Sequence, residues 1–152
     1  MKNNQLDYFM NYAFSEAKKA YNIDEVPIGA IIVLDNKIIG KGYNQCEMLS
    51  DSTAHAEMIA ITAASNTLGD WRLGKGVLFV TKEPCAMCSG AILNSRLRMI
   101  VFGCYDNHAG CCGSVYNLCG DPNLNNSVIV KGGILEEKCR GILSEYFQEK
   151  RN

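Results

Sequence analysis

The sequence predicts an α/β protein, a three-layer α/β/α sandwich whose central sheet is mixed and has about five strands. Five short apolar runs alternate with segments of helical periodicity, and turn-forming Gly, Asn and Asp residues separate them. A chain of 152 residues with 47% hydrophobic residues can bury its own core without disulfide staples. We therefore expect one domain over residues 1–152.

The first part of the chain predicts a helix and a hairpin. Apolar residues recur at steps of three and four over residues 6–17, which is typical of an amphipathic helix. Residues 28–34 form a nearly continuous aliphatic run and predict a strand buried on both faces. The turn residues Asp35-Asn36 join it to a second strand at residues 37–44.

The rest of the chain alternates helices with strands. Asp51, Ser52 and Thr53 are N-cap candidates for a helix over residues 54–64, with its exit at Gly69. The further predicted elements are a strand at 77–81, a helix from Pro84 to Leu93, a strand at 99–102, a loop around one short helix at 103–126, a strand at 128–131 and a helix at 135–148. This alternation favours a mostly parallel sheet with at least one antiparallel hairpin.

Two short motifs carry the chemistry: His55-Ala56-Glu57 and Pro84-Cys85-Ala86-Met87-Cys88. Cys85 and Cys88 lie three positions apart, in the first turn of a predicted helix, where the helix dipole favours thiolates. His55 and Glu57 point about 200° apart around a helix, so both can reach only something beyond its end. One imidazole and two thiolates suit Zn²⁺ and leave a fourth position for water, beside which Glu57 can act as a base.

Other uses of these cysteines are less consistent with the sequence. A lone CxxC is often a redox pair or half of a zinc ribbon, but His-Ala-Glu lies 30 positions upstream. Cys104, His108, Cys111 and Cys112 have spacings that a second metal site could use, and we interpret them as buried or incidental thiols. The eight cysteines with no secretion signal favour reduced thiols and a cytoplasmic protein.

The charge and hydropathy of the chain indicate which classes of partner it lacks features for. No run approaches the roughly 20 apolar residues that a membrane span needs, so we expect no membrane partner. The formal net charge is −1, so no global basic excess indicates a nucleic-acid partner.

The two motifs together resemble the signature of the cytidine deaminase-like zinc deaminase superfamily. Within it the chain is most similar to the bacterial tRNA adenosine deaminases of the TadA type. The softer matches are Val26-Pro27-Ile28-Gly29-Ala30, Gly42-Tyr43-Asn44, Val101-Phe102-Gly103, Gly113-Ser114 and Tyr146-Phe147. The resemblance implies a zinc-dependent hydrolase that converts adenosine to inosine at the anticodon wobble position of a tRNA.

The resemblance also implies roles for particular residues. His55, Cys85 and Cys88 would hold one zinc ion per subunit, and Glu57 would be the catalytic proton shuttle. The substrate contacts would be Asn44, Asp106, Tyr146 and Phe147, and the protein would be a homodimer. The departures from the family pattern are Cys46, Ser52, Lys82, His108 and Leu124-Asn125-Asn126. The change to His108 removes a lysine that would favour phosphate binding.

Two other functions stay open at the level of sequence. The chain could deaminate free bases or nucleosides of the guanine, cytosine or adenosine type, which its near-neutral charge allows. It could also be a noncatalytic RNA-binding subunit that is stabilised by zinc. The presence of Glu57 counts against that function, because a structural zinc site needs no proton shuttle.

Overall fold

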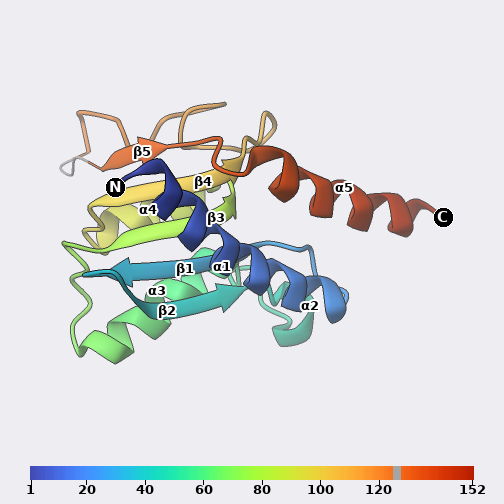
Figure 1. The fold of residues 1–152 in the computed structure, drawn as a ribbon, viewed down its shortest axis with the longest axis horizontal. Coiled ribbons are helices and arrows are strands. Elements are labelled where there is room, and N and C mark those ends of the chain that lie inside the picture. The colour runs from blue at the N-terminus through green and yellow to red at the C-terminus, as the bar shows by residue number, and fades with distance from the viewer. Residues whose placement is uncertain (125–127) are drawn as a thin grey trace.

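A five-stranded sheet forms the centre of the molecule in the computed structural model, which describes residues 1–124 and 128–152 (Figure 1). The strands are β1 (Gly29–Leu34), β2 (Lys37–Tyr43), β3 (Val77–Lys82), β4 (Met99–Cys104) and β5 (Ile129–Lys131). Their spatial order is β2-β1-β3-β4-β5. Strand β1 is antiparallel to both β2 and β3, while the β3/β4 and β4/β5 pairs are parallel.

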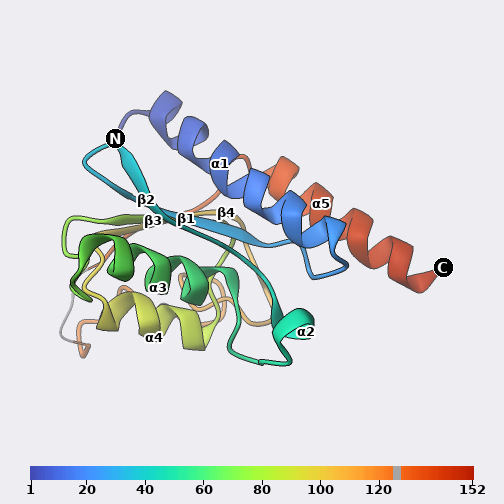
Figure 2. The ribbon, with the colours of Figure 1, turned by 90° about the horizontal axis from the view of Figure 1, so that it is seen from below.

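Helices cover both faces of this sheet (Figure 2). On one face lie α1 (Asn3–Asn22) and α5 (Glu136–Arg151), and on the other lie α3 (Ala56–Leu68) and α4 (Ala86–Asn94). A short helix, α2 (Cys46–Leu49), follows β2. The predicted three-layer sandwich is therefore confirmed.

Strict alternation along the strands divides the core into two layers. In β1, Ala30 and Ile32 pack in the cluster with α3 and α4, whereas Ile31 and Val33 pack in the cluster with α1 and α5. Successive residues of a strand point to opposite faces, so a strand buried on both faces must be apolar throughout. The continuous aliphatic run of β1 meets this requirement.

Three strands end at the same edge of the sheet. Strands β2, β3 and β4 run in one direction, because β1 is antiparallel to its two neighbours and β4 is parallel to β3. Asn44 follows β2, Pro84-Cys85 follows β3, and Asp106 follows β4. Ligands of open α/β sheets usually bind outside the carboxyl ends of strands, so this edge is where the functional site is expected.

Several predicted elements differ from those observed. The first helix runs over Asn3–Asn22, beyond the predicted 6–17, and α2 was not predicted. The sheet does not favour parallel pairing, since two of its four strand pairs are antiparallel. In the described part of the predicted loop, residues 103–124, there is no helix. The departure at Leu124-Asn125-Asn126 lies outside the described residues except for Leu124.

The predicted N-cap of α3 is also wrong. Helix α3 begins at Ala56 with His55 as its N-cap, and His55 makes no side-chain cap hydrogen bond. Asp51 instead accepts hydrogen bonds from the N–H and the hydroxyl of Thr53, at 2.8 and 2.7 Å. The Asp51 carboxylate therefore stabilises the turn at residues 51–53 and does not cap α3. His55, a residue of the metal motif, is the N-cap instead.

Within the described residues, none of the helices has both the length and the apolar character required to cross a membrane.

Candidate functional site

His55, Cys85 and Cys88 converge from the N-termini of two helices. His55 is the N-cap of α3 and Cys85 is the N-cap of α4, while Cys88 is buried in the first turn of α4. His55 Nδ1 lies 3.6 Å from Cys85 Sγ and 3.6 Å from Cys88 Sγ. Tetrahedral Zn²⁺, with Zn–N near 2.0 Å and Zn–S near 2.3 Å, separates nitrogen from sulfur by about 3.6 Å. The donor set therefore fits zinc in both its chemistry and its spacing.

Hydrogen bonds among the three donors shift their pKa values in opposite directions. A hydrogen bond from Cys88, followed by one from His55, lowers the pKa of Cys85 to about 3. The hydrogen bond with Cys85 in turn raises the pKa of His55, and the pKa of Cys88 is raised by the same Cys85 neighbour. Two helix N-termini add positive potential at the sulfurs. Because metal ligands must be deprotonated, Cys85 is suited to bind zinc as a thiolate, whereas Cys88 and His55 would release protons on binding.

Glu57 lies beside the three donors without being one of them. It occupies the first turn of α3 and is buried, with 4% of its surface exposed. Burial raises the pKa of its carboxyl group, and the group interacts electrostatically with Cys85, His55 and Cys88. A buried carboxyl group with a raised pKa next to a metal site is suited to accept and return a proton.

Asn44 is held at the same edge of the sheet. The N–H of the next residue, Gln45, donates to the carbonyl of Ala54 at 3.0 Å, which places Asn44 close to the start of α3. The Asn44 side chain is buried, and its Oδ1 accepts a hydrogen bond from Cys46 Sγ at 3.1 Å. Its amide NH₂ group is the part of the side chain that a substrate acceptor could use.

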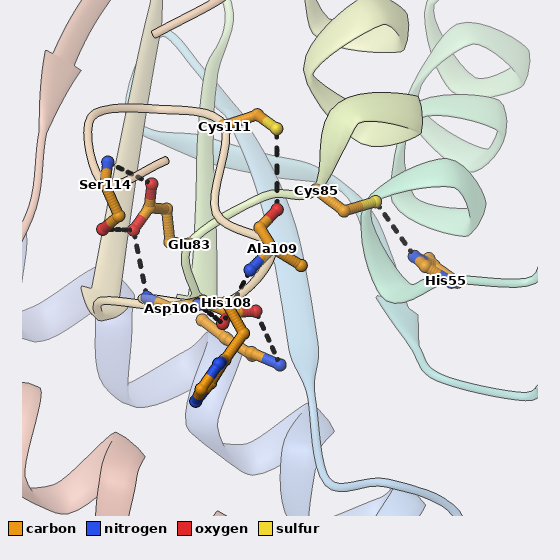
Figure 3. Close-up of polar contacts among 9 residues, drawn as sticks. His55, Glu83, Cys85, Asp106, His108, Ala109, Cys111 and Ser114 are labelled. Carbon is orange, nitrogen blue, oxygen red and sulfur yellow. Dashed lines mark hydrogen bonds and ion pairs between the residues drawn. The ribbon is translucent and has the colours of Figure 1, made fainter. Parts of the chain in front are cut away.

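Asp106 has both carboxylate oxygens engaged by the protein. Oδ1 accepts the N–H groups of His108 and Ala109 at 3.0 and 3.1 Å, and Oδ2 lies 3.1 Å from Lys82 Nζ (Figure 3). Partial burial alone would raise the pKa of Asp106, but the His108 N–H and the Lys82 ammonium outweigh it and lower that pKa. Lys82, which the sequence marks only as a departure from the family, is thus the counter-ion of a predicted site residue.

A groove of about 650 Å³ opens beside Asp106, between the loop that follows β4 and helix α5. Its polar lining includes Lys82, Arg140 and Arg151 as cations and Asp106 as the anion. Phe147 lines this groove and is 43% exposed. Two of these cations are held in ion pairs, Lys82 with Asp106 and Arg140 with Glu136. The groove therefore combines cationic side chains with an aromatic ring, a combination that suits a single-stranded nucleic acid.

Tyr146 does not share the exposure of its neighbour Phe147. Tyr146 is 9% exposed, and its hydroxyl donates to the carbonyl of Asp24 at 3.2 Å. The two rings are in edge-to-face contact, with centroids 5.3 Å apart, but only Phe147 lines the Asp106 groove. The substrate roles given to Asn44, Asp106, Tyr146 and Phe147 stay predictions.

The second cysteine cluster does not form a metal site in the described residues. Within residues 1–124 and 128–152, His55, Cys85 and Cys88 are the one group of three or more potential ligands that could share an ion. Cys111 Sγ donates to the carbonyl of Ala109, and Cys112 Sγ pairs with Cys119 Sγ at 3.5 Å. None of the eight cysteines forms a disulfide bond in the structure.

Sequence reasoning missed two buried carboxylates that hold loops at the site. Glu25 is 1% exposed and accepts the N–H groups of Glu47 and Met48 at the start of α2. Glu83 is 3% exposed and accepts hydrogen bonds from the loop that follows β4. Glutamates are rarely fully buried unless they are paired. A single sequence shows neither the burial nor the partners of a glutamate, so it gave no signal for the roles of Glu25 and Glu83.

Comparison with known proteins agrees with this geometry. The family described as "Cytidine and deoxycytidylate deaminase zinc-binding region" matches residues 3–104. A tRNA-specific adenosine deaminase of Bacillus subtilis is 45% identical over 97% of this chain and 91% of its own length. The enzyme of the same name from Haemophilus influenzae is 43% identical over 93% of this chain and 83% of its own length.

A solved structure from studies of A-to-I editing by tRNA:A34 deaminases superposes with a TM-score of 0.86. Its sequence is 39% identical, and the match covers 90% of this chain and 99% of the other. The chain therefore belongs to the zinc-binding cytidine and deoxycytidylate deaminase family and is a hydrolytic deaminase.

Proposed function

We propose that this deaminase converts adenosine to inosine at the wobble position of a tRNA anticodon loop. The observation that carries the chemistry is the placement of His55 Nδ1 at 3.6 Å from both sulfurs with the buried Glu57 beside them. The assignment of the substrate is supported by 42–45% sequence identity, over nearly the whole chain, to enzymes named tRNA-specific adenosine deaminase.

The reaction replaces the exocyclic amine of adenosine by oxygen, with water consumed and ammonia released. Zinc held by His55, Cys85 and Cys88 would supply an activated water as nucleophile. Glu57 would accept one proton from the attacking water and deliver it to the ring nitrogen beside the attacked carbon. It would then accept the second proton from the hydroxyl group added at that carbon and pass it to the amine, which leaves as ammonia. Burial of Glu57 supports this role, because a raised pKa lets the carboxyl group hold a proton between the two transfers.

The substrate is a single-stranded loop, because the target base must leave its stack to reach a buried metal. The amide NH₂ of Asn44 would donate a hydrogen bond to the flipped nucleoside. Phe147 and the cations Lys82, Arg140 and Arg151 would contact the flanking nucleotides along the groove.

We further propose that the protein acts as a single-domain homodimer in the cytoplasm. Met48 and Leu49 are each 54% exposed on α2, directly after the Asn44 turn, and a second subunit would cover them. Eight free thiols favour a reducing compartment. Sedimentation at micromolar concentration is expected to give a dimer, and a monomer under those conditions would contradict this assembly.

The test compares three substrate classes with one purified protein. The RNA is an anticodon stem-loop with adenosine at the wobble position, and its matched control has guanosine there. Free adenosine, guanine and cytosine are assayed separately, with product identified by nuclease digestion and mass spectrometry. Inosine in the adenosine stem-loop alone supports the proposal. Turnover of small molecules alone contradicts the substrate, and no turnover of any of them contradicts the enzymatic function.

A further inference from the structure

Glu83 holds both ends of one loop with a single buried carboxylate (Figure 3). Its Oε1 accepts the N–H of Asp106 at 3.0 Å and the hydroxyl of Ser114. Its Oε2 accepts the N–H groups of Cys112 and Ser114, each at 3.0 Å. These residues begin and end a segment that we call the 106–114 loop.

The 106–114 loop is packed so tightly against Glu83 that a Cβ atom at one of its positions would clash. A Cβ atom on Gly110 would lie 2.4 Å from Glu83 Cδ and 2.5 Å from the carbonyl oxygen of Asp106. A separate backbone hydrogen bond joins Cys111 N–H to the carbonyl of Pro84 at 2.8 Å. The loop is therefore packed against Glu83 and Pro84 along its length.

The same short stretch carries a zinc donor. Figure 3 shows the side chain of Glu83 pointing toward Ser114 and that of Cys85 pointing toward His55, and Pro84 lies between these two residues in the chain. Proline fixes its own φ angle, so Pro84 restricts the backbone between Glu83 and Cys85. The position of the loop relative to the metal is thereby tied to Glu83.

In all four hydrogen bonds that Glu83 makes, its carboxylate oxygens are the acceptors. An ionised carboxylate offers only acceptors, whereas the NH₂ group of glutamine would face an N–H donor and leave it unsatisfied. Two acceptor oxygens at position 83, and not only a side chain of this size, are therefore needed for the loop to keep its place.

We propose that Glu83 is a positioning residue that fixes Asp106, and with it the wall of the substrate groove, relative to the zinc donors. This proposal rests on the proposed function, because it assigns the groove to the RNA. Glu83 does not touch the reacting atoms. Its loss is expected to weaken substrate binding while the chemical step and the metal are kept.

The experiment uses Glu83→Gln and Gly110→Ala, which disturb the same contact from its two sides. Gly74→Ala is the matched control, because a Cβ there has its nearest neighbour 4.0 Å away, at the carbonyl oxygen of Arg96. Both test variants are expected to keep one zinc per chain and to raise KM for the stem-loop about tenfold, with kcat changed less than about threefold. The thiolate-to-metal absorption of the cobalt-substituted protein is expected to stay unchanged.

Unchanged KM in both test variants would overturn the proposal, as would joint loss of zinc and kcat. If Glu83→Gln does not fold, Gly110→Ala still decides, because it leaves the carboxylate in place. If the wild-type protein does not deaminate the stem-loop, the proposed function fails while this inference remains testable by hydrogen exchange. Glu83→Gln is then expected to speed exchange of the Cys112 and Ser114 amides with zinc retained, and unchanged exchange would overturn it.

Discussion

Lys82 and Asp106 form an ion pair across the ends of two parallel strands, with Nζ and Oδ2 3.1 Å apart. Lys82 is the last residue of β3, and Asp106 lies two residues beyond the end of β4. The sequence suggested that His108, in place of a family lysine, weakens the case for phosphate binding. The structure shows that Lys82 places an ammonium group in the same groove as His108.

Replacing Lys82 by methionine is expected to raise KM for the stem-loop with kcat unchanged. The substitution leaves the Asp106 carboxylate without its counter-ion in a groove proposed to face RNA phosphates, and about 1 kcal/mol corresponds to roughly a fivefold change. Steady-state kinetics at two salt concentrations measures the effect, which is expected to diminish at the higher one. Lys75→Met, an exposed lysine elsewhere on the surface, is the control. Equal KM values for wild type and Lys82→Met would contradict this role.

The same substitution predicts a change with pH. The pKa of Asp106 is lowered in the folded protein, so its interactions stabilise the fold above the unfolded value of about 3.9 and are lost as the pH falls through the folded pKa. The difference in unfolding free energy between wild type and Lys82→Met is thus largest at neutral pH and shrinks below about pH 4. Urea unfolding measures it, and both proteins share the same zinc site. A difference that grows with acid would contradict the assignment.

Removing zinc is expected to abolish deamination and to lower the melting temperature. The metal binds the folded protein and not the unfolded chain, so its binding energy adds to stability. Chelation followed by metal analysis and calorimetry tests this, and added zinc is expected to restore both properties. Full activity in protein shown to be free of metal would be inconsistent with the site formed by His55, Cys85 and Cys88.

Tyr146 and Phe147 are expected to respond differently to substitution although they are neighbours. Tyr146→Phe loses the hydrogen bond to the Asp24 carbonyl, so unfolding free energy falls by about 1 kcal/mol while KM is unchanged. Phe147→Ala removes an exposed ring from the groove, so KM for the stem-loop rises severalfold with little loss of stability. Equal effects of the two variants on KM would show that exposure does not decide their roles.

The sequence was sufficient for the positions of the strands and for the metal motifs, because both depend on local patterns. Apolar runs bounded by turn residues predict strands, and all five strands were found near their predicted bounds. His55, Cys85 and Cys88 each sit at a helix start, and the spacing of the two motifs predicts that arrangement. Fold class and candidate metal donors could therefore be predicted before any coordinates.

The parts that the sequence did not predict depend on contacts between distant residues. Glu83 meets its partners 23 to 31 positions away, and Glu25 meets the start of α2 22 positions away. No periodicity or local propensity records such pairs. The direction of Tyr146 and Phe147 likewise depends on which face of α5 meets α1, which only the packed structure decides.

Glu57 offers the most direct test of the central claim, that a carboxylate beside the zinc donors moves the protons of deamination. The measurement is inosine formation in the wobble-adenosine stem-loop by wild type and Glu57→Ala, with zinc content determined on the same samples. The account predicts a full complement of zinc in Glu57→Ala and a loss of kcat of about 10²–10⁴-fold. Retention of wild-type kcat, or loss of zinc from the variant, would contradict it.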